Sequence, residues 1–397
     1  MRTITLKEWT PQTQYLTTDE LASLRAASRY VSVQLDPDVP DAYRLVPNSR
    51  VGTLVFDQLR ILIRPKVNLP NVFFLLGYGA GLPEWTTSHF PFDLEGDLLR
   101  AVSWMFEAEV ASAIPRGLAR GYVDRQDALL TLRGRIDFTR QISARAGLPI
   151  PLECNFQEYS DDVSLNRKLK AAHVQLLRLA GLDDAVAKRL RAWLRAFVDV
   201  EDESFDRPFP DHEFDRLTAH WERAGRLAEL ILRRETLVDR EGSTYGRAFT
   251  VDMNKLFERF IERVVEERAQ QARVQLIPQA RRQLSRSAWM KPDLVISRRG
   301  VDGAVGDVKY KRLDIEDMPH ADLYQLLAYC TSMGLPRGIL IYATHEAPRV
   351  EVVHRAGIEL EITGVDLAQA PRDMLAQARS VADRLIDQAL VRGVDAA

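Results

Sequence analysis

Two carboxylates and a lysine stand close together between Met290 and Arg312, in a pattern that could do chemistry on a phosphodiester. Asp307 and Lys309 are two residues apart, so in a strand they share one face while Val308 points to the other. Asp293 opens the preceding apolar run, and the segment between the runs carries three glycines and an aspartate, which is turn chemistry. We therefore expect an antiparallel hairpin that brings Asp293, Asp307 and Lys309 to one spot.

Such a spot has the composition of a magnesium site. Two carboxylates and a backbone carbonyl are hard oxygen ligands, and magnesium keeps several of its waters and accepts phosphate oxygens. The ion lowers the pKa of a bound water, and the ammonium of Lys309 can orient that water or offset charge on the phosphate. The alternative is a solvated ion pair, because an Asp-x-Lys pattern alone is short and common.

The flanking segments add further polar side chains. Residues 251–270 carry apolar side chains at helical spacing, which predicts a helix with Glu258 at the edge of its buried stripe. Residues 321–334 predict a second helix, and residues 338–344 predict a strand after it. The polar face expected for the second helix carries Asp322, Gln325 and Tyr329, and its buried stripe consists of Leu323, Leu326, Leu327 and Cys330.

The order of these elements resembles the PD-(D/E)xK nuclease superfamily. The order is a helix with glutamate, a strand with Pro-Asp, a strand with Asp-x-Lys, a helix with Gln-x-x-x-Tyr, and a strand. The resemblance implies a C-terminal mixed sheet flanked by helices. It rests on Pro292-Asp293, Asp307-Val308-Lys309, Glu258, Gln325 and Tyr329.

The whole chain is expected to be an α/β protein, α+β overall, in three parts. Residues 1–160 predict a β-rich N-terminal domain, residues 161–240 a helical connector, and residues 241–397 the nuclease domain. Residues 71–79 fit a buried helix and a strand equally well. A last helix over residues 372–391 is expected to pack on the nuclease sheet.

Composition excludes several classes of protein. With 46% hydrophobic and 28% charged residues, the chain is ordinary for a globular protein, and no run of eighteen apolar residues or secretory signal is present. Cys154 and Cys330 are far apart, which argues against a disulfide framework or zinc site, so a cytoplasmic location is expected. The sequence contains no G-x-x-x-x-G-K-[ST] phosphate loop, so any nucleotide-driven motor would be another subunit.

The net charge of −2 hides a basic segment. Residues 280–312 carry nine basic and three acidic side chains, and two of these acids are the proposed metal ligands. Such a segment could neutralise DNA phosphates without reading bases, although a solvated basic face is the alternative. The expected DNA-binding residues are Arg298, Arg299, Lys311 and Arg312.

Several segments look like the McrC family, the nuclease subunit of McrBC-type modified-cytosine-dependent restriction systems. They are LRGRIDF, EYSDDVSLNRKLKAA, MNKLFERF, KPDLVI and GDVKYK, spread from about residue 130 onwards. The resemblance implies that the C-terminal domain cuts double-stranded DNA with Mg²⁺. It also implies that the N-terminal domain docks on McrB, a hexameric AAA+ GTPase, and stimulates it.

The resemblance also implies roles for individual residues of this chain. Asp293 and Asp307 correspond to metal ligands, with Glu258 assisting, and Lys309 to the residue that positions the attacking water. Gln325 and Tyr329 would support the site. Dimerisation of the nuclease for double-strand cutting is a further expectation.

Two rival functions come from other classes. One is a stand-alone nuclease of RecB type, a DNA exonuclease or repair enzyme, in which the Gln-x-x-x-Tyr helix also occurs. The other is a non-catalytic adaptor of the motor, against which the intact set of two acids and a lysine argues.

Overall fold

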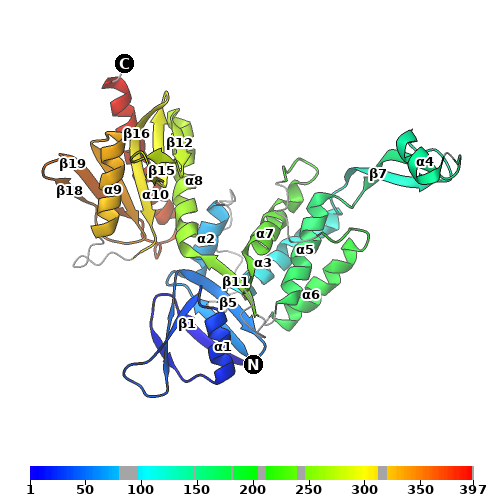
Figure 1. Cartoon of the computed structure of the whole chain (residues 1–397), viewed down its shortest axis with the longest axis horizontal. Helices are drawn as coiled ribbons and strands as arrows, with labels where there is room; N and C mark the ends of the chain where they lie inside the picture. Colours follow the sequence, from blue (N-terminus) through cyan, green and yellow to red (C-terminus); the bar gives the residue numbers. More distant parts are fainter. Residues whose placement is uncertain are drawn as a thin grey trace. The chain divides into compact units, whose positions relative to one another are not determined.

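The structure, a computed structural model, describes residues 1–79, 97–146, 148–179, 182–203, 212–238, 246–311 and 320–395. The chain divides into two compact units, each assembled from separate segments (Figure 1). Unit 1 comprises Met1–Ile4, Gly52–Ile61 and Asp97–Thr250, and unit 2 comprises Thr5–Val51, Leu62–Gly96 and Val251–Ala397. The three contiguous domains expected from the sequence stay a prediction.

Unit 2 contains a mixed six-stranded sheet that carries the predicted hairpin. Its strand order is β12-β15-β16-β17-β19-β18. The hairpin of β15 and β16 is antiparallel, as expected, whereas β16, β17 and β19 run parallel. The strands are β12 (Gln275–Pro278), β15 (Leu294–Arg298), β16 (Val301–Lys309), β17 (Arg337–Tyr342), β18 (Arg349–Val353) and β19 (Ile358–Gly364).

Helices cover both faces of this sheet. The expected helices are present as α8 (Met253–Ala272), α9 (His320–Met333) and α10 (Pro371–Asp395). Helix α9 lies on one face and α10, which packs against α8, on the other (Figure 1). Helices cover both faces here, so residues 294–297 are all buried. Side chains that point to opposite faces of this strand therefore both lie in a core, and neither set faces solvent.

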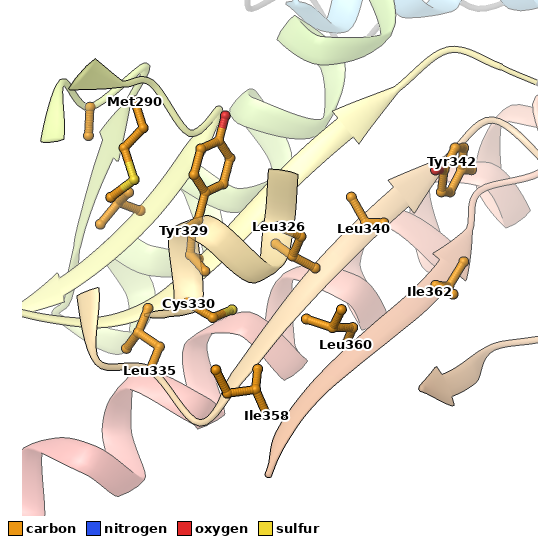
Figure 2. Packing of buried hydrophobic residues seen from close by; sticks show 13 residues of the cluster. Met290, Leu326, Tyr329, Cys330, Leu335, Leu340, Tyr342, Ile358, Leu360 and Ile362 are labelled. Atoms are coloured by element: carbon orange, nitrogen blue, oxygen red, sulfur yellow. The ribbon is translucent and has the colours of Figure 1, made fainter. Parts of the chain in front are cut away.

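The core on the α9 face is built from helix and strand side chains. Leu326 and Cys330 lie against β17, where Leu340 is also buried (Figure 2). A Cβ at Gly338 would meet Cys330 Sγ at 2.6 Å, so glycine lets the helix approach the strand. Tyr329 belongs to this core, so its expected place on a polar face of α9 is wrong.

The glycines of the predicted hairpin have two different structural roles. Only Arg299 and Gly300 form the turn, with φ of 51° and 82°. Gly303 and Gly306 lie inside β16, so their expected place in the linking segment is wrong. A Cβ at Gly303 would meet Ala389 Cα of α10 at 2.7 Å, which explains the need for glycine.

The N-terminal part of unit 2 adds small elements. The strands β2 (Gln12–Gln14), β3 (Val31–Leu35) and β4 (Tyr43–Pro47) form one sheet, and α1 (Thr18–Ala26) begins at a capping box of Thr17 and Glu20. Residues 71–79, which fitted helix or strand, lie in helix α2 (Leu69–Gly79).

A further sheet has the order β1-β6-β5-β11-β10, and its residues are divided between the units. Its strands are β1 (Arg2–Lys7), β5 (Arg50–Phe56), β6 (Leu59–Arg64), β10 (Glu235–Val238) and β11 (Gly246–Asp252).

Unit 1 is largely helical with one antiparallel sheet. The helices are α3 (Leu98–Ala113), α5 (Ser164–Arg178), α6 (Asp184–Leu194) and α7 (Glu222–Arg234). The sheet has the order β7-β9-β8, with α4 (Phe138–Arg145) beside it, and its strands are β7 (Gly121–Leu129), β8 (Arg135–Ile136) and β9 (Leu152–Ser160). No helix among the described residues is both long and apolar enough to span a membrane.

Candidate active site

The hairpin places the two expected carboxylates opposite each other. Leu294 pairs with Gly306, so Asp293 and Asp307 follow at the next position of the two strands. The Val308 N–H donates to Asp293 Oδ2 at 2.9 Å, and Lys309 Nζ lies 2.5 Å from Asp307 Oδ2. The predicted convergence of Asp293, Asp307 and Lys309 is therefore confirmed as geometry.

The face on which this cluster lies follows from strand alternation. Val305 belongs to the core under α9, and Asp307 is two residues further along β16, so it points to the same side. Val308 points to the opposite side and is buried there, as expected. The carboxylate cluster thus lies on the same face of the sheet as α9.

Burial makes it unfavourable for both carboxyls of this pair to be ionised at once. Burial and the negative charge of Asp293 raise the pKa of Asp307 to about 7. Burial also raises the pKa of Asp293, against the hydrogen bonds from Val308 and Asp307. Burial alone would lower the pKa of Lys309, but the charge of Asp307 raises it, so this lysine stays protonated.

Gln279, which the sequence analysis does not predict as a site residue, links Glu258 to the two aspartates. Its Nε2 donates to Asp293 Oδ1 at 3.1 Å and also to Glu258 Oε1 of α8. Its backbone N–H donates to the Asp293 carbonyl, and its φ of 51° is left-handed. Only the pairing of β12 with β15 places Gln279 there, and that long-range register leaves no local signal.

Burial, together with the charge of Glu262, raises the pKa of the Glu258 carboxyl. Glu258 therefore stands beside the cluster, held by an amide, as a partly buried carboxyl.

The Gln-x-x-x-Tyr pair is hydrogen bonded within α9. Gln325 Nε2 lies 2.6 Å from the Tyr329 hydroxyl, with Gln325 exposed and Tyr329 buried. Burial and the charge of Asp307 raise the pKa of Tyr329 to about 12.

A second polar group lies next to the cluster. Asp322, expected on a polar face, is buried, where it accepts hydrogen bonds from Tyr342 at 2.8 Å and from Lys311 at 3.1 and 3.2 Å. Sequence reasoning did not single out Tyr342, because its hydroxyl partner lies on another element.

The expected DNA-binding residues are not gathered in one place. Arg298 and Arg299 lie at the hairpin turn, five and six residues from Asp293, which is on the order of 17 Å along the strand. Arg298 Nη1 donates to the Leu390 carbonyl at 3.1 Å. Lys311 lies two residues beyond Lys309, and Arg312 falls outside the described residues.

The oxygen atoms of this cluster suit a magnesium ion. Asp307 Oδ2 is buried beside Lys309 Nζ at 2.5 Å, and a carboxylate oxygen has more than one lone pair, so it can also accept a cation. Within the described ranges, no group of three or more His, Cys, Asp or Glu side chains is disposed to hold a metal by itself. Two carboxylates fit magnesium, which takes its other ligands from water and phosphate.

Comparison with known proteins gives a family and a fold. A family model described as "McrBC 5-methylcytosine restriction system component" matches residues 45–343, and no curated protein matches. A chain in the "Refined half-complex from tetradecameric assembly of Thermococcus gammatolerans McrB AAA+ hexamers with bound McrC" has 21% identity and a TM-score of 0.60. The match covers 96% of this chain and 100% of that chain, and it shows a shared fold.

A second solved structure, the cryo-EM structure of the Thermococcus gammatolerans McrBC complex, has 24% identity and covers 66% of this chain and 87% of that chain. Its TM-score of 0.43 is too low to support an argument. The family match spans more than half of the chain and confirms the resemblance seen in the sequence. The chain therefore belongs to the McrBC 5-methylcytosine restriction system component family.

Proposed function

We propose that this chain is the DNA-cutting subunit of a McrBC-like restriction complex, a Mg²⁺-dependent endonuclease that works with an AAA+ GTPase and stimulates it. The observation that carries the proposal is the cluster of Asp293, Asp307 and Lys309, with Asp307 buried, in a chain of this family. The substrate is double-stranded DNA with modified cytosine, as the family description suggests.

Each residue of the cluster has a distinct part. Asp293 is fixed by Val308 and Gln279, and Asp307 presents a buried oxygen beside it, so these two would hold the ion. When bound, magnesium would supply a more acidic water and offset charge on the phosphate. Lys309 keeps a positive charge where it can orient a water or neutralise a phosphate oxygen.

Glu258 would assist from the edge of the cluster through Gln279. Gln325 and Tyr329 would support the site from α9, where their hydrogen bond fixes the tyrosine hydroxyl.

The partner would dock on unit 1. The segment 121–160 exposes large apolar side chains over half of their surface, which is costly in water and typical of an interaction surface. We call this set the apolar patch, and it consists of Tyr122, Leu130, Leu132, Phe138, Ile142, Leu148, Ile150 and Tyr159. The solved relative, in which McrC is bound to McrB AAA+ hexamers, supports a partner of that class.

The experiment compares Asp307→Asn with Asp302→Asn. Asp302 is on the same strand but pairs with Arg282 at 2.7 Å, away from the cluster, so it is a matched control. In the assembled complex with methylcytosine DNA, Mg²⁺ and GTP, Asp307→Asn should lower cleavage by more than about 100-fold. Asp302→Asn should cut normally, and equal cleavage by both variants would refute the assignment.

The same assays separate the rival functions. Digestion of DNA by the wild-type chain without a nucleotide or partner would favour the stand-alone exonuclease. Stimulation of the GTPase without any cutting by the wild-type complex would favour the adaptor.

A further inference from the structure

A groove of about 820 Å³ opens in unit 2 beside the carboxylate cluster. Part of its lining comes just after the carboxyl ends of three parallel strands. Lys311 follows β16, His345 follows β17 and Asp366 follows β19. Ligands bind preferentially at the carboxyl ends of parallel strands. Asp307 and Lys309 lie at the same end of β16, and the two residues after Lys309, Tyr310 and Lys311, line the groove.

The remaining walls come from the far N-terminal part of the chain. Lys7 ends β1 and Trp9 and Thr10 follow it, and Lys66, Val67 and Asn68 follow β6. Tyr310, which also lines the groove, donates from its hydroxyl to Glu8 Oε1 at 2.7 Å, and the Lys66 N–H donates to the same oxygen at 2.6 Å. The buried Glu8 thus ties both N-terminal walls to the residue after Lys309.

The groove is basic. Lys7, Lys66 and Lys311 line it with exposed side chains, and Asp366 is the acidic residue of the lining. Two other acids lie close by and are buried. Glu8 accepts a hydrogen bond from Tyr310, and Asp322 accepts one from Tyr342 and forms an ion pair with Lys311, so Lys7 and Lys66 contribute most of the basic character. Lysine side chains complement the negative charge of a sugar–phosphate backbone.

Trp9 adds an aromatic surface under backbone strain. Its φ of 59° is left-handed, which is rare for a bulky residue, and its side chain is 47% exposed in the groove wall. Hydrogen bonds from the Trp9 N–H to Pro47 and from the Thr10 N–H to Lys7 hold this conformation. Strain of this kind persists where the surroundings enforce it and often marks a functional residue.

We propose that this groove binds an unpaired stretch of the DNA strand next to the cut, with Lys7, Lys66 and Lys311 on its phosphates and Trp9 stacked on a base. The proposal rests on the proposed function, since it names where that DNA continues beyond the cluster. It gives the N-terminal segment of unit 2 a part in holding DNA. Positive side chains combined with an aromatic platform are what single-stranded nucleic acid requires.

The test measures DNA binding with cleavage switched off. The full chain carrying Asp307→Asn is titrated into a labelled single-stranded oligonucleotide of about 12 nucleotides, followed by fluorescence anisotropy. Adding Lys7→Ala and Lys66→Ala should weaken binding about 10-fold and reduce the salt slope by about 1.4, since each phosphate contact contributes about 0.7 for a single strand. Lys188→Ala with Lys255→Ala removes the same charge from exposed positions outside the groove, and it should change binding less than about 2-fold.

Trp9→Gly tests the aromatic platform without endangering the fold. Glycine adopts the left-handed conformation freely, so the variant should unfold at the same or a higher temperature, yet bind the single strand about 10-fold more weakly. Trp9→Phe should restore most of the affinity because it keeps a ring.

Three results would overturn the proposal. The first is that the chain does not bind the oligonucleotide measurably. The second is that the groove lysine pair and the control lysine pair lose the same affinity when changed to alanine. The third is that Trp9→Gly leaves the affinity for the single strand unchanged. Failure of the proposed function is seen separately, because it appears as cleavage that survives Asp307→Asn. The groove could then still bind DNA in the anisotropy assay.

Discussion

Asp307 sits where burial and a neighbouring carboxylate both oppose its ionisation. Its pKa of about 7 lies well above the usual 3.8 because the site lacks a strong enough positive charge to offset burial and Asp293. Lys309 lies 2.5 Å away but compensates only in part. A divalent cation would relieve the repulsion between the two ionised carboxylates, so its binding should stabilise the folded protein.

The raised pKa predicts how stability depends on pH without divalent ions. Between about pH 4 and pH 7 the folded state binds a proton at Asp307 that the unfolded state releases, so the free energy of unfolding falls as pH rises through this window. Asp307→Asn removes this dependence on pH. The free energy of unfolding of the variant should therefore increase relative to that of the wild type as the pH rises to about 7. Urea unfolding in EDTA at several pH values measures it. Parallel curves for the two proteins would contradict the assignment.

Magnesium should act in the opposite direction. Because the ion binds ionised carboxylates, saturating Mg²⁺ should raise the melting temperature of the wild type by on the order of 5 °C at pH 8, and by less at pH 6. Asp307→Asn should lose the response, and Asp302→Asn should keep it. An equal response in both variants would place the ion elsewhere.

At the scale of elements, β16 and α10 depend on glycine for their close approach. A methyl group at Gly303 would meet the Ala389 backbone at 2.7 Å, whereas at Gly306 the nearest atom is Leu385 Cδ2 at 3.4 Å. Gly303→Ala should therefore cost about 1–3 kcal/mol, and Gly306→Ala much less. Chemical denaturation of the two variants compares them directly, and equal costs would contradict this packing.

The elements around the site could be predicted from the sequence better than their contacts. Glu258 on a helix, the hairpin with Asp293 and Asp307, and the helix carrying Tyr329 all follow from local spacing, and all are present. The same spacing predicts a polar face for α9, but Asp322 is buried, where it accepts hydrogen bonds from Tyr342 and Lys311 of other segments.

Contacts between distant segments left no local signal. Gln279 reaches Asp293 through the β12–β15 register, and Glu8 reaches Tyr310 across 302 positions of the chain. The grouping of Thr5–Val51 with unit 2 also depends on contacts between segments that are far apart in the chain.

At the scale of the whole molecule, the proposed activities fall on different units. The carboxylate cluster belongs to unit 2, whereas the apolar patch belongs to unit 1. The polar side chains around the patch already pair with one another, as Arg133 does with Glu158 and Arg145 with Glu153. The apolar side chains are therefore the part of that surface with the most to gain from a partner.

A separation of function follows from this division. Ile142 on α4 is 67% exposed, so Ile142→Asp should fold normally, yet it should lower stimulation of the AAA+ partner's GTPase about 10-fold or more, because a buried charge at an interface is costly. Val198→Asp is the control, since Val198 is 76% exposed in the same unit but outside the patch. GTP turnover measured with both variants, and with Asp307→Asn, should show loss only for Ile142→Asp. Because Asp307→Asn should keep the stimulation and lose cleavage, stimulation lost in that variant or retained in Ile142→Asp would show that the two activities do not divide between the units.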